Sequence, residues 1–230
     1  MRLRERENGH MTMTIDHSLE ERFPDLGVLT LRIRDVTVAR QSAVLERRRR
    51  EVVLQVKARY DLESLKDVPA FRAYRDFFWK VRIDPTKNRP AAEALIRSIL
   101  RGRALPRINT LVDAYNVASI MTTVALAAFD LDKLVGDLRM RVADAGDEFV
   151  GIGMTTPMRL QGGEIVVSDA EKIVAIYPHR DAENTKITAT TRNVLLMVCG
   201  VPGIGEDALL DAARVATECI REFCGGELTA

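Results

Sequence analysis

A group of polar side chains interrupts an otherwise apolar segment in the middle of the chain. Asn109, Asp113 and Asn116 are spaced by four and by three residues, so on a helix they share one face, and Tyr115 lies next to them. Amide and carboxylate groups arranged in this way can orient a water molecule or hold a small polar ligand. The same residues are also compatible with a purely structural hydrogen-bond network, because buried amides need partners.

A second group of reactive side chains follows an apolar run near residue 176. Charged, imidazole and hydroxyl groups come close together in residues 177–191, and the candidates among them are Tyr177, His179, Arg180, Asp181, Thr188 and Thr191. Functional side chains concentrate on loops at the ends of strands. The alternative is a solvated loop in which Asp181 and Thr185 only cap turns.

Several common catalytic signatures are absent from the sequence. It contains no Gly-x-x-x-x-Gly-Lys-Ser/Thr loop, no Gly-x-Ser-x-Gly elbow and no His-Glu-x-x-His helix. Cys199 has no base near it in the sequence and is interpreted as a small core residue. The three cysteines lack a Cys-x-x-Cys spacing and histidines are few, so we expect no metal and no other cofactor.

The elements that must position these groups can be read from the hydrophobic pattern. Apolar residues at helical spacing predict helices at 40–60, 71–79, 91–101 and 207–223, and a helix of small residues that ends at about residue 128. Short apolar runs bounded by Gly, Pro and Asp predict strands at 27–33, 139–142, 149–153, 164–168 and 172–177. Residues 194–199 form either a strand or a helix. The pattern predicts an α+β fold in which β-sheets are flanked by helices.

Two features of these helices concern packing and charge. The rings of the 71–79 segment, Trp79 included, are assigned to the core. The four arginines 47–50 point in four directions on a helix, so we interpret them as a solvated basic girdle in preference to a dedicated RNA contact.

Domain organisation and location follow from composition. Residues 1–18 are expected to be a flexible leader and residues 19–230 a single domain. No apolar run reaches the ~20 residues of a membrane span, and no secretory signal is recognisable, so a membrane is not expected as a partner. Unpaired cysteines fit a reducing compartment. We therefore expect a cytoplasmic protein.

The formal net charge is +1, but the charge is distributed unevenly. Residues 1–107 hold 24 basic and 15 acidic side chains, whereas residues 108–230 hold 10 basic and 18 acidic ones. A basic half next to an acidic half is compatible with a local surface that binds nucleic acid, although the overall net charge does not indicate such a surface.

Several motifs occur in one order along the chain. They are Asp84-Pro85-Thr86-Lys87-Asn88-Arg89-Pro90, Pro106-Arg107-Ile108-Asn109, Val112-Asp113-Ala114-Tyr115-Asn116, Ala128-Phe129-Asp130-Leu131-Asp132-Lys133 and Gly162-Gly163-Glu164. Together they resemble the editing module of the phenylalanyl-tRNA synthetase beta chain, its paired third and fourth B domains, and especially the free-standing versions of that module. The resemblance covers about residues 20–225. It implies a layered α+β fold and hydrolysis of an amino acid wrongly esterified to tRNA, here in trans because the adenylate-forming domain is absent.

The chain departs from the synthetase pattern at defined positions. Ala127 stands where the synthetases have His, and Met197 where they have Glu. Asn116 matches the pocket Asn of the pattern, and Thr188 and Thr191 approximate its threonines. His179-Arg180-Asp181 replaces a glycine-rich loop, which indicates a polar or charged amino acid as substrate. Canavanine on arginine tRNA, which some free-standing relatives remove, is one such substrate.

The resemblance and the residue types together assign roles. Catalysis is assigned to Asn116, Arg180 and Thr188, which would orient water and stabilise the oxyanion. Substrate binding is assigned to Asn109, Asp113, Tyr115, Tyr177, His179, Asp181 and Thr191. The tRNA phosphates are assigned to Lys80, Lys87, Arg89, Arg97, Arg101, Arg103 and Arg107. Those basic residues are expected to surround the opening that Asn116 lines.

Two other functions remain open from the sequence. One is a non-catalytic RNA-binding or protein-interaction module that kept the fold, which the absence of the pocket His and Glu suggests. The other is hydrolysis of a free aminoacyl ester or small amide, which needs no basic surface. The sequence does not predict the oligomeric state.

Overall fold

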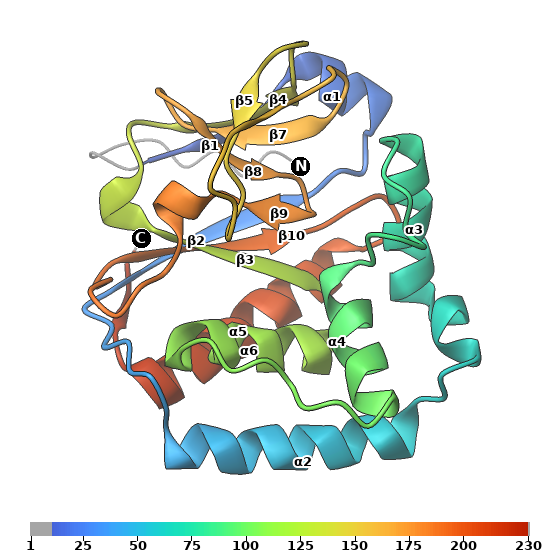
Figure 1. Ribbon diagram of the computed structural model, residues 1–230, viewed down its shortest axis with the longest axis vertical. Helices are drawn as coiled ribbons and strands as arrows, with labels where there is room; N and C mark the ends of the chain where they lie inside the picture. The colour runs from blue at the N-terminus through green and yellow to red at the C-terminus, as the bar shows by residue number, and fades with distance from the viewer. Residues whose placement is uncertain (1–10, 230) are drawn as a thin grey trace.

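Two apolar segments, Ala125–Asp130 (β3) and Val194–Cys199 (β10), form neighbouring antiparallel strands in which every residue is buried. In the computed structural model, which describes residues 11–229, they belong to a central four-stranded sheet of order β11-β2-β10-β3 (Figure 1). A strand buried on both faces needs apolar side chains at every position. These two strands therefore lie in the middle of a layered structure.

The remaining strands build two further sheets. The five-stranded sheet has the order β1-β4-β7-β8-β9, and β5 pairs with β6 in a separate hairpin. The strands are β1 Met13–Ile15, β2 Val28–Arg34, β4 Leu138–Val142, β5 Glu148–Phe149, β6 Met158–Arg159, β7 Ile165–Ser168, β8 Ile173–Ile176, β9 Arg180–Asp181 and β11 Glu227–Thr229. The two strands expected at 164–168 and 172–177 correspond to β7 and β8, which pair antiparallel as a hairpin.

Six α-helices accompany the sheets within the described residues. They are α1 His17–Arg22, α2 Ala43–Arg59, α3 Pro69–Lys80, α4 Ala91–Leu100, α5 Thr110–Thr122 and α6 Glu206–Cys224, with short 3₁₀ helices η1 Ser64–Asp67, η2 Leu131–Lys133 and η3 Glu183–Thr185. Local signals set several ends. Proline is the first residue of α3, and Gly225 adopts φ 68° directly after α6.

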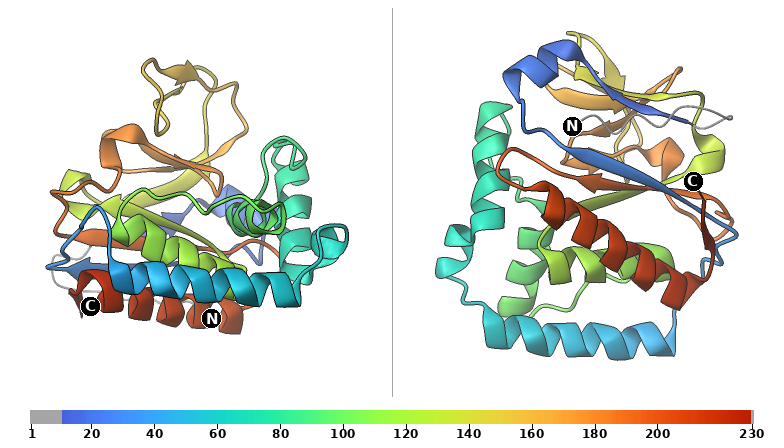
Figure 2. Two further views of the ribbon diagram at one scale, coloured as in Figure 1. Left: turned by 60° about the horizontal axis from the view of Figure 1, so that its bottom comes forward. Right: turned by 180° about the vertical axis from the view of Figure 1, so that it is seen from behind.

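The helices and sheets stack in layers, as expected for the α+β fold. Helices α5 and α6 pack side by side against one face of the central sheet, and α2 lies across α5 on the outside (Figures 1 and 2). The five-stranded sheet lies over the other face of the central sheet, and α3 and α4 stand along one side (Figure 1). The prediction of layered sheets flanked by helices is confirmed. No helix within residues 11–229 is long and apolar enough to cross a lipid bilayer.

Several predicted boundaries were wrong. The helix expected to continue to residue 128 ends at Thr122, Thr123 takes a left-handed conformation, and a strand follows. Runs of small apolar residues do not distinguish a helix from a strand that is buried on both faces. Of the expected strand at 149–153, only Phe149 lies in a strand, the two-residue β5 Glu148–Phe149. Residues 194–199 form a strand, so the strand alternative was correct.

Two other expectations fail for reasons of tertiary contact. Residues 1–10 of the expected leader lie outside the described residues, but Met13–Ile15 pairs in parallel with β4 and His17 begins α1. Arg49, expected in a solvated girdle, is 6% exposed and forms an ion pair with Asp113 at 2.7 Å. The pairing of Met13–Ile15 and the burial of Arg49 both depend on contacts with residues far away in the sequence. Local sequence patterns do not reveal such contacts.

Candidate functional site

A pocket of about 160 Å³ opens at the free edge of the central sheet, beside β3. Its walls come from the start of α4, the middle of α5, the edge strand β3, strand β10 and the β8–β9 hairpin. The lining residues are Ala91, Tyr115, Asn116, Leu126, Ala127, Ala175, Ile176, Tyr177, Pro178, His179, Arg180, Asp181, Met197 and Cys199. Drug-sized ligands occupy pockets of about 300–1,000 Å³. This pocket is smaller and has room for an amino-acid side chain.

The pocket unites residues from the two groups that the sequence singled out. Tyr115 and Asn116 come from α5, and they face the hairpin segment that carries Tyr177, His179, Arg180 and Asp181. More than 60 residues of sequence separate the two groups. The structure therefore supports one joint site built from parts of both groups.

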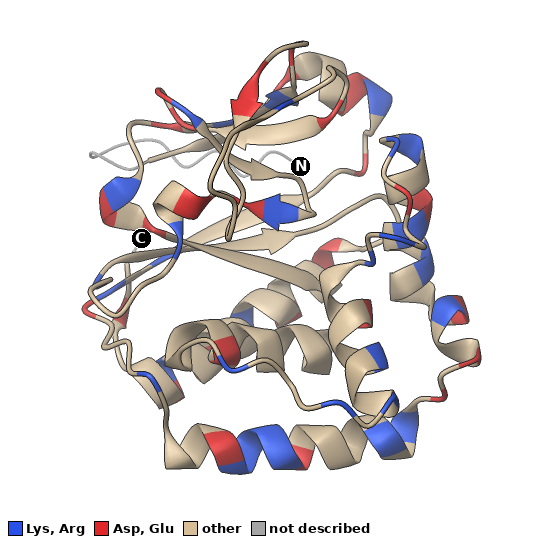
Figure 3. Cartoon of the chain, viewed as in Figure 1, with Lys and Arg blue, Asp and Glu red and all other residues tan. Residues whose placement is uncertain are grey.

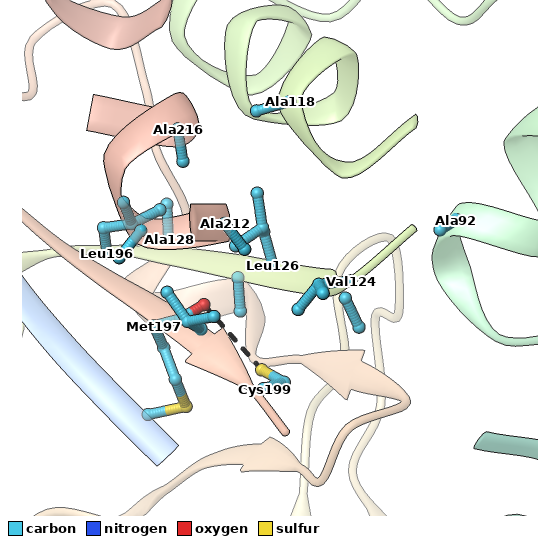
Figure 4. Close-up of a cluster of buried hydrophobic side chains, with 14 of the residues drawn as sticks. Ala92, Ala118, Val124, Leu126, Ala128, Leu196, Met197, Cys199, Ala212 and Ala216 are labelled. Atoms are coloured by element: carbon cyan, nitrogen blue, oxygen red, sulfur yellow. Dashed lines mark hydrogen bonds between the residues drawn. The ribbon is translucent and has the colours of Figure 1, made fainter. Parts of the chain in front are cut away.

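The two positions that depart from the synthetase pattern also lie in this pocket. Ala127 on β3 is directly opposite Met197 on β10 in the antiparallel ladder, and both line the cavity. Figure 4 shows Leu196 directed toward α6, whereas Met197 and Cys199 point to the other side of the sheet. This alternation is the ordinary property of a strand. It gives the pocket an apolar floor.

Asp181 is the charged group most affected by the pocket. Burial raises the pKa of its carboxyl to about 7, because a carboxylate is poorly solvated there. Among the described residues, no side chain forms an ion pair or hydrogen bond with this carboxylate. The backbone carbonyl of Asp181 accepts a hydrogen bond from the N–H of Ile152 at 2.9 Å. A cationic ligand group would supply the missing partner.

Two neighbours of Asp181 respond to its charge. The pKa of the Tyr115 hydroxyl is raised by burial and by the nearby Asp181 carboxylate. The pKa of the Cys199 thiol is raised well above its ordinary value by the same two causes. A thiol that resists ionisation is a poor nucleophile. Cys199 is a buried core residue, as expected, although it also forms part of the pocket wall.

His179 and Arg180 form the outer wall of the pocket. Burial lowers the pKa of the His179 imidazole, and the adjacent Arg180 lowers it further, so the ring is neutral near pH 7. The ring of Phe78 contacts His179 edge-on, with the ring centres 6.2 Å apart. Arg180 donates a hydrogen bond to the carbonyl of Ile152 at 3.1 Å.

Gly151 makes room for the Arg180 side chain. A Cβ atom at Gly151 would collide with Nε of Arg180 and approach its Cδ to 2.8 Å. The missing side chain therefore lets the guanidinium lie against the backbone of residues 151–152. Arg180 is held in one orientation although it is exposed to solvent.

Tyr177 anchors the pocket wall to the central sheet. It is buried, and its hydroxyl donates a hydrogen bond to the carbonyl of Gly200 at 2.5 Å. The peptide bond between Tyr177 and Pro178 is cis. Tyr177 was predicted as a substrate-binding residue; its ring lines the cavity, but its hydroxyl is already used by the protein.

Asn109 and Asp113 do not line the pocket, contrary to the prediction. The Asn109 side chain caps α5 by accepting hydrogen bonds from the N–H groups of Leu111 and Val112 at 3.1 and 2.9 Å. Asp113 forms a buried ion pair with Arg49 and accepts a hydrogen bond from the N–H of Ile108 at 3.1 Å. These contacts favour the structural hydrogen-bond alternative for these two residues.

Thr188 and Thr191 also lie outside the residues that line the pocket. The Thr191 hydroxyl donates to the carboxylate of Asp130 at 2.7 Å and accepts from the N–H of Thr188 at 3.0 Å. The Thr188 hydroxyl lies 3.0 Å from that of Thr190. These contacts fix the turn before β10, so the predicted roles of these threonines in catalysis and substrate binding find no support in the geometry.

The basic residues predicted for tRNA fall into two groups (Figure 3). Lys80 and Lys87 are exposed, and Arg89 is half-buried, between the end of α3 and the start of α4, next to the pocket residue Ala91. Arg101 and Arg103 are exposed beyond the other end of α4, a helix about 15 Å long. The expectation that all of them surround one opening was therefore wrong.

Two arginines of that set are engaged with acidic side chains. Arg97 is half-buried and forms an ion pair at 3.2 Å with Glu93, a fully buried residue that Arg75 also contacts at 2.9 Å. Arg107 is exposed but forms an ion pair with Glu46 at 2.8 Å. Arg97 was predicted to bind a tRNA phosphate, but its guanidinium is directed toward the buried Glu93.

The sequence did not single out most of the apolar wall of the pocket. Leu126, Ala175 and Ile176 give no chemical signal, because they resemble any other buried strand residue. Pro178 follows the cis peptide bond and could have been noted as a turn residue. Among the described residues, no group of three or more His, Cys, Asp or Glu side chains is arranged to hold a metal ion.

Comparison with known proteins identifies relatives of this chain. The phenylalanine–tRNA ligase beta subunit of Yersinia pestis is 27% identical over 184 residues, which cover 80% of this chain and 22% of that protein. The same subunit of Fusobacterium nucleatum subsp. nucleatum is 33% identical over 103 residues, 45% of this chain and 13% of that protein. The chain thus matches less than a quarter of the length of these curated relatives.

Structure comparison and a family model agree with this similarity. An N-terminal fragment of the phenylalanyl-tRNA synthetase beta subunit from Pyrococcus horikoshii matches with a TM-score of 0.52 at 15% identity, over 97% of this chain and 52% of that chain. That likeness shows a shared fold. The family model of the B3/4 domain matches residues 73–225, more than half of the chain. The chain belongs to the B3/4 domain family.

Proposed function

We propose that this protein is a trans-acting hydrolase that removes a wrongly attached polar or charged amino acid from tRNA. The observation that carries the proposal is the pocket in which Asn116, His179, Arg180 and Asp181 converge over an apolar floor. The two relatives named above are tRNA ligase subunits, so an aminoacylated tRNA is the substrate class that links the family to the pocket.

The pocket fits an amino acid better than a larger ligand. Its volume of about 160 Å³ admits one side chain, and the unpaired Asp181 carboxylate selects a positive charge there. The floor at Ala127 and Met197 offers no group that hydrogen-bonds a phenolic hydroxyl strongly. A cationic amino acid or cationic non-protein analogue, such as canavanine on arginine tRNA, therefore suits the pocket better than tyrosine does.

The reaction needs no covalent intermediate. The Asn116 amide orients a water molecule, and the neutral imidazole of His179 accepts a proton as the water oxygen bonds to the ester carbonyl carbon. The guanidinium of Arg180 stabilises the negative charge on the carbonyl oxygen. The bond from this carbon to the ribose oxygen then breaks, and the ribose oxygen takes up the proton.

The experiment is a deacylation screen with the purified full chain. A panel of aminoacyl-tRNAs, including ones carrying cationic and non-protein amino acids, is incubated with the protein, and release of the amino acid is followed. We expect turnover for a cationic amino acid and little for phenylalanine or tyrosine. Absence of turnover above buffer for the whole panel would contradict the proposal.

Matched variants test the residues of the site. Asn116→Ala and Asp181→Asn should each slow deacylation at least tenfold. Asp144→Asn is the control for Asp181, because it makes the same change on a side chain that is 92% exposed and does not line the pocket. If all three variants turn over like the parent chain, the pocket is not the active site.

A second function is favoured by one observation. Apolar Ala127 and Met197 replace the His and Glu of the synthetase pattern, so a module that binds tRNA without hydrolysis is also compatible with the floor of the pocket. Equal affinity for charged and uncharged tRNA, together with no hydrolysis, would select this second function. Preference for charged tRNA would reject it.

A further inference from the structure

The only tryptophan of the chain lies on the surface. Trp79 is 56% exposed at the end of α3, although the sequence pattern assigned it to the core. Its neighbours Phe77 and Phe78 are almost fully buried. Tryptophan is buried on average, because its large ring gains free energy when removed from water. An exposed tryptophan on an otherwise well-packed helix indicates a surface that binds a partner.

Cationic residues follow this ring closely in the sequence. Lys80 is the next residue, Arg82 comes three residues after Trp79, and Lys87 lies on the loop that leads to α4; all three are exposed. Within residues 11–229, none of the three forms an ion pair, unlike Arg72 and Arg75 on the same helix, which pair with Asp67 and Glu93. Surfaces that bind single-stranded nucleic acid combine cations, which contact the phosphates, with exposed aromatic rings, on which bases stack.

Another cation joins the group from a different element. Arg22 of α1 donates a hydrogen bond to the carbonyl of Lys80 at 2.9 Å, and its guanidinium stacks on Phe23, 4.9 Å from the ring centre. Arg22 is exposed as well. Cations at a helix C-terminus also interact favourably with the helix dipole. That effect accounts for the charges but not for the exposed indole ring.

The surface lies next to the proposed active site. Phe78 precedes Trp79 and contacts His179, a pocket residue, with its ring centre 6.2 Å away. Consecutive helix residues point about 100° apart. The last turn of α3 therefore presents Phe78 to the pocket wall and Trp79 to solvent.

We infer that Trp79, Lys80, Arg82 and Lys87 form a binding surface for the unpaired 3′ end of a tRNA, in which the indole ring of Trp79 stacks on a base. The inference rests on the proposed function, because the amino acid is attached to that unpaired end. Lys80, Arg82 and Lys87 bind its phosphates, and the stacked base guides the ester toward the pocket. Base stacking tolerates any sequence, as an end shared by many tRNAs requires.

The test uses the intrinsic fluorescence of the full chain, since Trp79 is its single tryptophan. The probe is an uncharged RNA hairpin with a short unpaired 3′ tail, compared with the same hairpin lacking the tail. We expect the tailed hairpin to quench Trp79 emission and to bind at least fivefold more tightly than the blunt one. Unchanged emission, or equal quenching by both hairpins, would overturn the inference.

Variants separate stacking from charge. By fluorescence anisotropy of labelled tailed hairpin, Trp79→Ala should weaken binding about 5- to 100-fold, and Trp79→Phe, which keeps a ring, should weaken it less. Leu54→Ala is the control, because Leu54 is an exposed apolar residue on α2, away from this surface. Equal affinity of Trp79→Ala and the parent chain would overturn the inference.

Two further outcomes separate this inference from the proposed deacylation. Tail-dependent quenching without any deacylase activity supports the surface and contradicts the hydrolase. Deacylation that is unaffected by Trp79→Ala, together with no quenching of Trp79 emission, supports the hydrolase and contradicts the binding surface. If Trp79 emission instead shifts with protein concentration in the absence of RNA, the ring contacts a second copy of the chain, and the inference is wrong.

Discussion

Ala127 and Met197 lie directly opposite each other on β3 and β10, and both line the pocket. The resemblance to the synthetases pointed to these two positions separately, as the sites where His and Glu are replaced. The structure makes them one cross-strand pair, in which the Cβ atoms are about 4.5–5.5 Å apart. The two replacements therefore alter one wall of one site.

This pairing predicts how the two positions depend on each other. Met197→Glu places a carboxylate at a fully buried position and should lower the free energy of unfolding by about 3 kcal/mol or more. Ala127→His in the same chain should recover part of the loss, because the imidazole can hydrogen-bond the new carboxylate. Urea unfolding of both single variants and the double variant measures the coupling, and strict additivity would contradict it.

Asp181 makes stability depend on pH. Its pKa is about 7 in the folded chain, above the value of about 4 expected when unfolded. Unfolding therefore releases a proton between about pH 4 and 7, and the free energy of unfolding falls as the pH rises through this window. Asp181→Asn should lose this fall and be more stable than the parent chain at pH 8 by about 1–3 kcal/mol. Urea unfolding of both chains at pH 5 and pH 8 measures this difference; an unchanged pH dependence in Asp181→Asn would contradict the raised pKa of this half-buried carboxyl.

Gly151 should act through Arg180. Gly151→Ala forces the Arg180 side chain away from the carbonyl of Ile152, so it should slow deacylation about as much as Arg180→Ala does. The double variant should be no slower than either single one, because both changes remove the same placed guanidinium. Gly205→Ala is the control, because Gly205, like Gly151, does not have a positive φ and no atom lies within 4 Å of an added Cβ. Independent effects that multiply in the double variant would show that Gly151 acts elsewhere.

Two buried tyrosines form a matched pair for stability. The Tyr74 hydroxyl donates to the carbonyl of Cys199 at 2.6 Å and accepts from the N–H of Ala125 at 3.0 Å, so it bridges β10 and β3. Tyr74→Phe leaves two buried groups unpaired and should cost about 2–4 kcal/mol. Tyr177→Phe loses only the bond to Gly200 and should cost about 1–2 kcal/mol. Thermal or urea unfolding ranks the two, and a larger loss for Tyr177→Phe would contradict this reasoning.

Asp113 should be important for stability rather than for catalysis. Asp113→Ala removes the nearer carboxylate partner of the buried Arg49 guanidinium, which keeps Glu46 at 3.4 Å, and should lower the free energy of unfolding by about 3 kcal/mol. The double variant Arg49→Met with Asp113→Leu should be more stable than Asp113→Ala, because no unpaired charge remains. Under conditions where the Asp113→Ala variant is folded, its deacylation rate should match that of the parent chain. Loss of deacylation in a folded Asp113→Ala variant would show that Asp113 takes part in the site.

Much of the secondary structure could be predicted from the sequence. The strand at 28–34, the helices at 69–80 and 91–100 and the hairpin after Ser168 follow from local periodicity and turn residues. The failures lie where burial is complete. The segment 125–130 reads equally well as the end of a helix, because a strand buried on both faces shows no alternation.

The candidate site shows the same division. The sequence by itself determined which residue types were available, and it flagged Asn116, His179, Arg180 and Asp181 as reactive groups in two segments. Only the tertiary structure decided that these segments share one pocket, that Asp113 forms an ion pair with Arg49 and that Trp79 faces solvent. The physical reason is that the partner of a buried charge, and the solvation of a ring, depend on residues distant in sequence. Local patterns report propensity, whereas burial and pairing are properties of the packed chain.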